Sequence, residues 1–163
     1  AIGFVVANNA DGEIQGRFGH ATVAANGNDI INPRRSDGLS IAAEGASGSG
    51  NILTVVDVIN NNIDGGLDSG TVVGSDEGIE VFNGGLGNNG GLMHVTIRNN
   101  DIGDSTALMD DIGILSRTRD DSQMRIDIDN NNLHTNDESM DLGGGGIGLE
   151  RYRDSRQPDQ STP

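Results

Sequence analysis

The sequence predicts an all-β solenoid, and two phased motifs together with the composition support this prediction. The first motif is a short apolar strand, written G-I-x-V or close to it, that starts again every 33 to 40 residues. It occurs five times: Ile2-Gly3-Phe4, Leu39-Ser40-Ile41, Ile79-Glu80-Val81, Ile112-Gly113-Ile114 and Ile147-Gly148-Leu149. Because a fixed period of this length is typical of repeat proteins, we name this segment strand one of each repeat.

The second motif, V-x-I-x-N-N-x-I, runs in step with the first and occupies residues 56–63, 95–102 and 126–133. A fourth copy at residues 21–30 is two residues longer. Alternating apolar residues predict a half-buried strand two, and the residues after the Asn cluster predict the start of strand three. Asn favours the bend between them because it tolerates left-handed backbone angles. We expect one Asn from each bend to stack into an amide ladder: Asn28, Asn61, Asn100 and Asn131.

One repeat therefore contains strand one, a Gly-rich or polar loop, strand two, an Asn bend, strand three and a return loop. The return loop often ends in an acid, as at Asp37, Asp76, Glu77, Asp110 and Asp111. Gly, Asn and Asp are poor helix formers, and no stretch keeps a 3.6-residue apolar period, so a helical fold is excluded. Strands that stack repeat upon repeat are parallel, and parallel crossovers are right-handed in nearly all proteins.

The predicted architecture is a right-handed parallel β-helix of about four complete coils of three short strands, open at both ends. Residues 1–152 form a single β-helix segment, and residues 153–163 form a flexible tail or the start of a further coil. Apolar residues make up 33% of the chain and aromatic residues 2%, too few for an ordinary globular core but enough for a thin apolar column. Disorder is the alternative for so acidic a chain, but a disordered chain has no reason to keep two phased motifs.

Charge and composition exclude several classes of function. The net charge is −15 and the chain contains no lysine, which argues against nucleic-acid binding and against anionic membrane surfaces. No run of about twenty apolar residues is present to insert into a membrane. The absence of cysteine excludes disulfides and thiolate metal sites.

The two motifs resemble the right-handed parallel β-helix repeats of the pectin-lyase-like superfamily. The resemblance is closest to the Asn-rich repeats of secreted and surface-anchored bacterial proteins such as adhesins and autotransporter passengers. It implies an extracellular or cell-surface location and a polysaccharide or cell-surface ligand. The open ends of the predicted solenoid add the expectation of end-to-end or lateral self-association. The first expectation is a non-catalytic structural or adhesive segment of a larger bacterial protein, a stiff rod that displays variable loops.

The superfamily also contains polysaccharide lyases and hydrolases, so a carbohydrate-active β-helix is an alternative. Catalytic groups of such enzymes would lie on the outward face of strand one, whose expected outward residues are Gly3, Ser40, Glu80, Gly113 and Gly148. This row has one acid and therefore no acid–base pair. A second region contains Asp110, Asp111, Arg117, Arg119, Asp120 and Asp121, which we interpret as a solvated loop with partly paired charges. Asp111 and Arg117 are its weak catalytic candidates, with Arg as the base of a lyase.

A third alternative is a Ca²⁺-stiffened unit of a surface layer or filament. Acidic loops supply the oxygen ligands that Ca²⁺ prefers, and no other cofactor is expected. The densest set of candidate ligands is Asp101, Asp104, Asp110 and Asp111.

Overall fold

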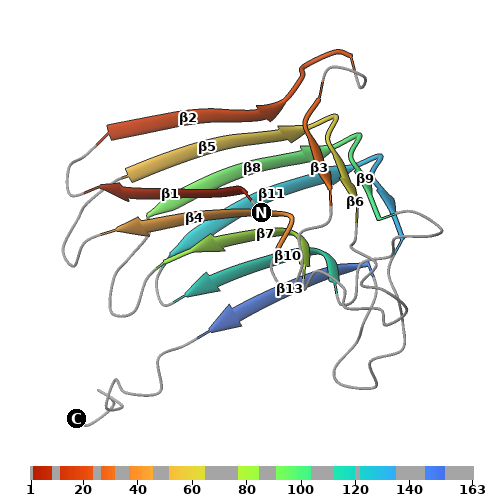
Figure 1. Ribbon diagram of the computed structural model, residues 1–163. Helices are drawn as coiled ribbons and strands as arrows, with labels where there is room; N and C mark the ends of the chain where they lie inside the picture. Colours follow the sequence, from red (N-terminus) through yellow and green to blue (C-terminus); the bar gives the residue numbers. More distant parts are fainter. Residues whose placement is uncertain are drawn as a thin grey trace, which may run out of the picture.

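The computed structural model describes residues 2–8, 12–23, 27–31, 37–45, 52–64, 77–84, 91–103, 112–119, 122–134 and 146–152. These residues form thirteen strands and contain no helix, so none of them forms a helix that could cross a membrane. The strands form three parallel sheets, which we name A, B and C (Figure 1). The prediction of an all-β chain of stacked parallel strands is therefore confirmed.

Each sheet contains one strand from each repeat. Sheet A consists of β1 (Ile2–Asn8), β4 (Leu39–Gly45), β7 (Glu77–Asn83), β10 (Ile112–Arg119) and β13 (Ile147–Tyr152). Sheet B consists of β2 (Gly12–Gly19), β5 (Ile52–Ile59), β8 (Leu92–Arg98) and β11 (Gln123–Asp129). Sheet C consists of β3 (Asp29–Ile31), β6 (Asn62–Asp64), β9 (Asp101–Ile102) and β12 (Asn132–Leu133).

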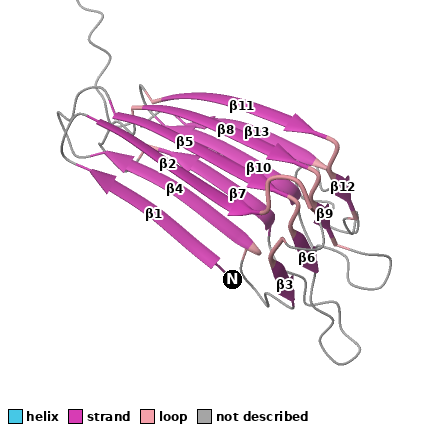
Figure 2. Cartoon of the chain, turned by 90° about the horizontal axis from the view of Figure 1, so that it is seen from above, coloured by secondary structure: helices cyan, strands magenta, loops and turns pink. Residues whose placement is uncertain are grey.

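The chain passes from sheet A to sheet B to sheet C and then returns to sheet A, and we call each such passage a coil. Sheets A and B face each other with strands that run in opposite directions, and the short strands of sheet C lie across one end (Figures 1 and 2). Four coils are followed by β13, which is the fifth strand of sheet A. This solenoid-like architecture is consistent with a parallel β-helix.

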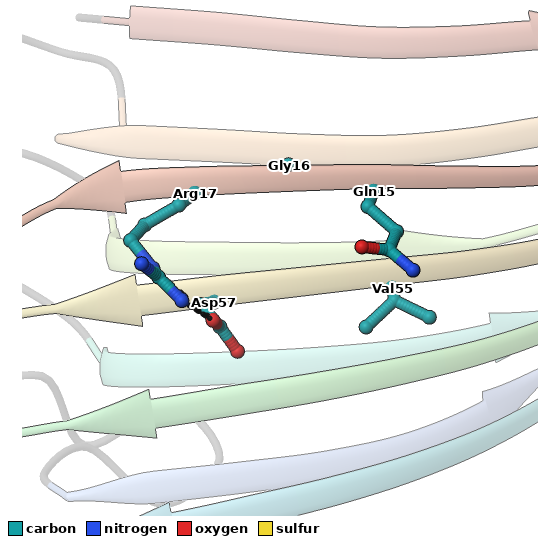
Figure 3. A pocket seen from close by; sticks show the side chains of 5 residues that line it. All are labelled: Gln15, Gly16, Arg17, Val55 and Asp57. Atoms are coloured by element: carbon teal, nitrogen blue, oxygen red, sulfur yellow. Dashed lines mark hydrogen bonds and ion pairs between the residues drawn. The ribbon is translucent and has the colours of Figure 1, made fainter. Parts of the chain in front are cut away.

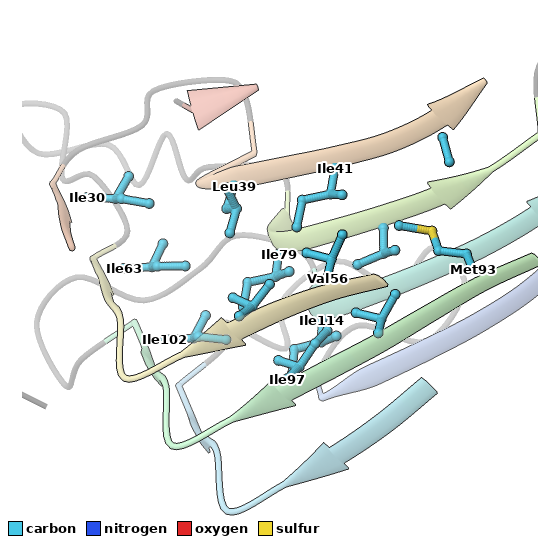
Figure 4. Packing of buried hydrophobic residues seen from close by; sticks show 14 residues of the cluster. Ile30, Leu39, Ile41, Val56, Ile63, Ile79, Met93, Ile97, Ile102 and Ile114 are labelled. Carbon is cyan, nitrogen blue, oxygen red and sulfur yellow. The ribbon is translucent and has the colours of Figure 1, made fainter. Parts of the chain in front are cut away.

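The core is a column of branched aliphatic side chains enclosed by the three sheets (Figure 4). In sheet B, Val56 pairs with Val95 and Val95 pairs with Ile126, so the inward positions of the V-x-I motif stack in strict register. Ile63 and Ile102 of sheet C stack in the same way and are fully buried. Alternation along each strand therefore places one face of the motif in the core and leaves the other outside.

One sequence-based alignment is wrong by two residues. The sequence analysis aligned Ile112 with Ile79, whereas β10 pairs Ile114 with Ile79 and Ile112 with Glu77. The outward row of strand one therefore contains Leu115, which is fully buried, in place of Gly113.

The observed register is explained by a glycine at the corner between sheets C and A, directly before the paired residues Leu39, Ile79, Ile114 and Ile147. These glycines are Gly38, Gly78, Gly113 and Gly146. A Cβ at Gly78 would collide with Ile102 Cγ2 and lie 2.5 Å from the carbonyl oxygen of Gly113. A Cβ has no room at Gly78 and would be in tight contact at Gly113, where its nearest neighbours would lie at 3.2 Å. Glycine therefore stacks on glycine at this corner, and Ile114 follows in line with Ile79.

The bends after strand two have left-handed backbone at their first Asn. Asn60, Asn99 and Asn130 have φ values of 58°, 55° and 51°. The sequence pattern predicts a left-handed or bridge conformation at the ladder Asn of the bend, such as Asn100, whereas the positive φ belongs to the residue before it. The two differ because the first Asn turns the chain, while the second directs its side chain along the stack.

Candidate functional site

The first feature of interest is a hydrogen-bonded column of Asn side chains that passes through all four bends. The side-chain amide of Asn28 donates to Asn61 Oδ1 at 2.9 Å, and the amide of Asn61 donates to Asn100 Oδ1 at 2.9 Å. The amide of Asn100 donates to Asn131 Oδ1 at 2.8 Å. These are the four residues that the sequence analysis assigned to a ladder.

Backbone groups join the same column. The backbone N–H of Asn61 donates to Asn100 Oδ1 at 2.9 Å, and the N–H of Asn100 donates to Asn131 Oδ1 at 3.0 Å. The second amide hydrogen of Asn100 reaches the carbonyl oxygen of Val58 at 3.0 Å. Asn61 and Asn100 are buried, and such bonds are needed there because an unsatisfied buried polar group is costly. The ladder therefore fixes each bend to the bends of its neighbouring coils.

The second feature is a group of charged side chains on the outer face of sheet A, which we call the Arg117 cluster. It consists of Asp37, Glu77, Glu80, Arg117 and Glu150. Asp37 precedes β4, Glu77 and Glu80 belong to β7, Arg117 belongs to β10 and Glu150 belongs to β13. Because β4, β7, β10 and β13 are consecutive neighbours in sheet A, residues spread over most of the sequence meet at one place.

Arg117 is the centre of the cluster. Its Nη1 lies 2.6 Å from Glu80 Oε1, its Nε lies 3.1 Å from Glu150 Oε2, and its Nη2 lies 3.5 Å from Glu77 Oε1. The hydroxyl of Ser40 donates to the other oxygen of Glu80 at 3.2 Å. The Glu77 side chain is 10% exposed, the Glu80 side chain 18%, the Arg117 side chain 29% and the Glu150 side chain 40%. The two acids of β7 are therefore largely withdrawn from water, whereas Glu150 is open to it.

Burial and neighbouring acids change the protonation of the cluster. Burial, a hydrogen bond with Asp37 and the charge of Asp37 raise the pKa of Glu77 to about 8, against the opposing effect of Arg117. Burial and Asp37 also raise the pKa of Glu80. Burial alone would lower the pKa of Arg117, but the hydrogen bond to Glu150 and the charges of Glu80 and Glu77 raise it overall. At neutral pH, Glu77 is therefore protonated and hydrogen-bonded to Asp37, while Arg117 is charged.

The chemistry available to the cluster is that of a carboxylic acid held protonated beside other carboxylates and a cation. A carboxyl group with a pKa near 7 is suited to general acid catalysis. Sequence reasoning found Arg117 but missed this arrangement, since it expected a nearly featureless outward strip with one acid. The available signal was an acid directly before the corner glycine in two successive repeats, Asp37-Gly38 and Glu77-Gly78. The register of β4 on β7 stacks these two pairs on each other.

The remaining predicted site residues are dispersed or lie outside the described residues. Asp104, Asp110 and Asp111 belong to the latter group, as do Asp120 and Asp121. Asp101 is exposed at the start of β9 and accepts a hydrogen bond from the side chain of Asn132 at 2.9 Å. Among the described residues, no group of three or more His, Asp or Glu side chains is arranged to hold a metal ion.

A shallow pocket of about 270 Å³ lies on sheet B at Gln15, Gly16, Arg17, Val55 and Asp57 (Figure 3). Arg17 Nη2 and Asp57 Oδ2 form an ion pair across it at 2.8 Å. The two residues pair in register on β2 and β5, and the Arg17 side chain is half exposed. An exposed pair of this kind contributes little stability, so we interpret it as a cross-strand contact.

Comparisons with protein-family models, curated proteins and solved structures find no match to this chain.

Proposed function

We propose that the chain is a non-catalytic structural or adhesive segment of an extracellular or cell-surface protein, built as a right-handed parallel β-helix of the pectin-lyase-like type. The observation that carries this proposal is the unbroken Asn ladder. Four amides from four coils are each tied to the next by hydrogen bonds of 2.8 to 2.9 Å. Asn28 is exposed, whereas Asn61, Asn100 and Asn131 are buried or half-buried. Such a column resists shear and separation between coils, which is the mechanical property of a stiff rod that displays loops.

The charge of the chain supports the same proposal. With a net charge of −15 and no lysine, the surface repels nucleic acid and anionic lipid. An acidic rod of this kind is compatible with a saline or cation-rich medium outside the cell. The ligands that fit the proposal are a polysaccharide or another cell-surface molecule.

A carbohydrate-active β-helix is the second candidate, and the Arg117 cluster favours it. Glu77 is positioned to act as a general acid because it keeps its proton near neutral pH. Glu80 and Asp37 would supply a second carboxylate, and Arg117 would neutralise an acidic sugar. In the structural proposal the same residues only join four neighbouring strands of sheet A.

Activity measurements on a panel of acidic and neutral polysaccharides separate the two functions. A lyase produces unsaturated sugar ends, which absorb ultraviolet light, whereas a hydrolase releases reducing ends without that absorbance. The structural proposal predicts neither product from the wild-type chain. The structural proposal would be overturned in favour of an enzyme by turnover that is lost in Glu77→Gln or Arg117→Met. The same turnover should then be kept in the matched variants Glu13→Gln and Arg17→Met on sheet B. Circular dichroism would verify that each variant is folded.

A further inference from the structure

Two oxygen atoms in the core have no hydrogen-bond partner among the described residues. They are Oγ1 of Thr54, which belongs to β5, and Oδ1 of Asn83, the last residue of β7. Both residues are fully buried, so bulk water does not reach them. Proteins pair almost all such atoms with protein groups or with ordered water, because a buried polar atom without a partner is costly. The two oxygens therefore require a partner.

The orientation of the Asn83 amide is fixed by its nitrogen. Nδ2 donates to the carbonyl oxygen of Gly91 at 3.2 Å and to the carbonyl oxygen of Gln123 at 2.7 Å. The exchanged orientation would place Oδ1 against two carbonyl oxygens, which accept hydrogen bonds and cannot donate them. Both amide hydrogens are therefore used, and Oδ1 is an acceptor that points away from these two carbonyl groups.

Asn83 joins coils at the end of sheet B that lies opposite the Asn ladder. Gly91 directly precedes β8 of coil 3, and Gln123 is the first residue of β11 in coil 4. Because the amide nitrogen reaches from coil 3 toward coil 4, the amide oxygen lies on the side of coil 2. Thr54 belongs to coil 2 and pairs with Met93, two residues after Gly91. Met93 itself points into the core (Figure 4).

Thr54 is a polar exception in an apolar row of the core. The residues that stack with it in register on sheet B are all apolar: Ile14, Met93 and Met124. On sheet A, the residue of coil 2 that pairs with Asn83 is Ala43, whose methyl group offers no hydrogen bond. Among the inward residues of these two rows, the Thr54 hydroxyl is therefore the polar group that coil 2 presents to Asn83.

The two oxygens do not form a hydrogen bond with each other. Thr54 and Asn83 belong to different sheets and to different coils, and the χ1 angle of a β-branched residue such as Thr is stiff. A small molecule that both donates and accepts hydrogen bonds would satisfy the two atoms together. Water has this property, and buried waters in proteins typically make about three hydrogen bonds to groups that otherwise have no partner.

We propose that one buried water molecule bridges Thr54 Oγ1 and Asn83 Oδ1. The water donates one hydrogen to Asn83 Oδ1 and forms a second hydrogen bond with the Thr54 hydroxyl, which can donate or accept. Asn83 then connects coil 2 through the water, coil 3 through Gly91 and coil 4 through Gln123. It is a second clasp between coils, at the opposite end of sheet B from the Asn ladder. This site depends on the core alone and holds whether the chain is a rod or an enzyme.

The variant Thr54→Val tests the proposal by the sign of its effect on stability. Valine has nearly the shape of threonine but no hydroxyl group. If the hydroxyl had no partner in the folded chain, its removal would raise the melting temperature, because a buried unpaired polar group would be lost. If water bridges it to Asn83, removal deprives the water of one bond, and we expect the melting temperature to fall by about 2–4 °C. The matched control Thr96→Val, on the outward face of β8, should change it little.

A double-variant comparison and direct observation of the water complete the test. In the background of Asn83→Ala, Thr54→Val should no longer lower the melting temperature, since the bridge is already broken. A high-resolution crystal structure of the wild-type chain should show a water oxygen about 2.6–3.2 Å from both Thr54 Oγ1 and Asn83 Oδ1, which needs no variant to fold. A higher melting temperature of Thr54→Val, an equal decrease with and without Asn83, a direct bond between the two side chains, or no water at this position would each overturn the proposal.

Discussion

Asn100 gives both its backbone N–H and its side-chain amide to one oxygen, Asn131 Oδ1, at 3.0 and 2.8 Å. Asn100 also receives two bonds from Asn61 at its own Oδ1, so one side chain connects three coils. Asn100 is 1% exposed, and water cannot replace these bonds if the amide is removed.

Replacement of Asn100 by valine should therefore lower the free energy of unfolding by about 1–3 kcal/mol. The matched control is Thr96→Val, which introduces the same side chain on the outward face of the same repeat and should have a much smaller effect. Chemical denaturation followed by circular dichroism measures both. Equal stability of Asn100→Val and the wild type would contradict a stabilising role for the ladder.

The glycine corner predicts a graded response to a single added methyl group. Gly78→Ala should cost about 1–3 kcal/mol, since its Cβ would collide with Ile102 and the backbone of Gly113. Gly113→Ala should cost less, because its Cβ would lie 3.2 Å from its nearest neighbours, Gly146 O and Leu133 Cδ2. Thermal melts compare the two variants. The reverse order would show that the register of the corner is not the one described.

The Arg117 cluster predicts stability that falls as the pH rises. The pKa of Glu77 is about 8 in the folded chain and 4.5 in the reference state, so between these values the folded state binds more protons than the unfolded state. The contribution of Glu77 to the free energy of unfolding is fully present below pH 4.5 and is lost progressively as the pH rises to about 8. Over this interval the free energy of unfolding falls by at most about 1.4 kcal/mol per pH unit. Denaturation midpoints measured from pH 5 to 8 should therefore decrease.

The variant Glu77→Gln tests the origin of that slope. A neutral amide imitates the protonated acid, so the slope should become flatter, whereas Glu13→Gln on sheet B should leave it unchanged. A wild-type stability that rises over this pH interval would contradict the assigned protonation of Glu77.

The repeat pattern was enough to predict the strands, since alternating apolar residues before an Asn pair have few other interpretations. The register of β10 was not predictable in this way, because Ile112 and Ile114 flank Gly113 with the same alternation. Only the collision of a Cβ at the corner distinguishes them. The two-residue error also hid the cluster. With Ile112 opposite Ile79, the partner of Glu80 would be Gly113, four residues before Arg117. In the structure the partner of Glu80 is Leu115, only two residues before Arg117.

Calcium binding remains a prediction for the acidic loops. If Asp110 and Asp111 belong to a cation site, millimolar Ca²⁺ should raise the melting temperature, because a ligand that binds only the folded state stabilises it. The double variant Asp110→Asn/Asp111→Asn should abolish the increase, and Asp57→Asn should not. An identical increase in the double variant and the wild type would exclude these two residues as ligands.

Disulfide trapping tests the in-register stacking of coils most directly, because the chain contains no cysteine of its own. Thr96 and Asp127 are outward partners on β8 and β11, so their Cα atoms should lie about 4.8 Å apart, within the range that a disulfide spans. The pair Thr96→Cys/Asp127→Cys should oxidise readily to an intramolecular disulfide with the melting temperature kept or raised. The pair Thr96→Cys/Arg125→Cys, on the same face but two residues out of register at roughly 8 Å, should oxidise slowly or lose stability. Equal oxidation of the two pairs, or preference for the second, would contradict the stacked register.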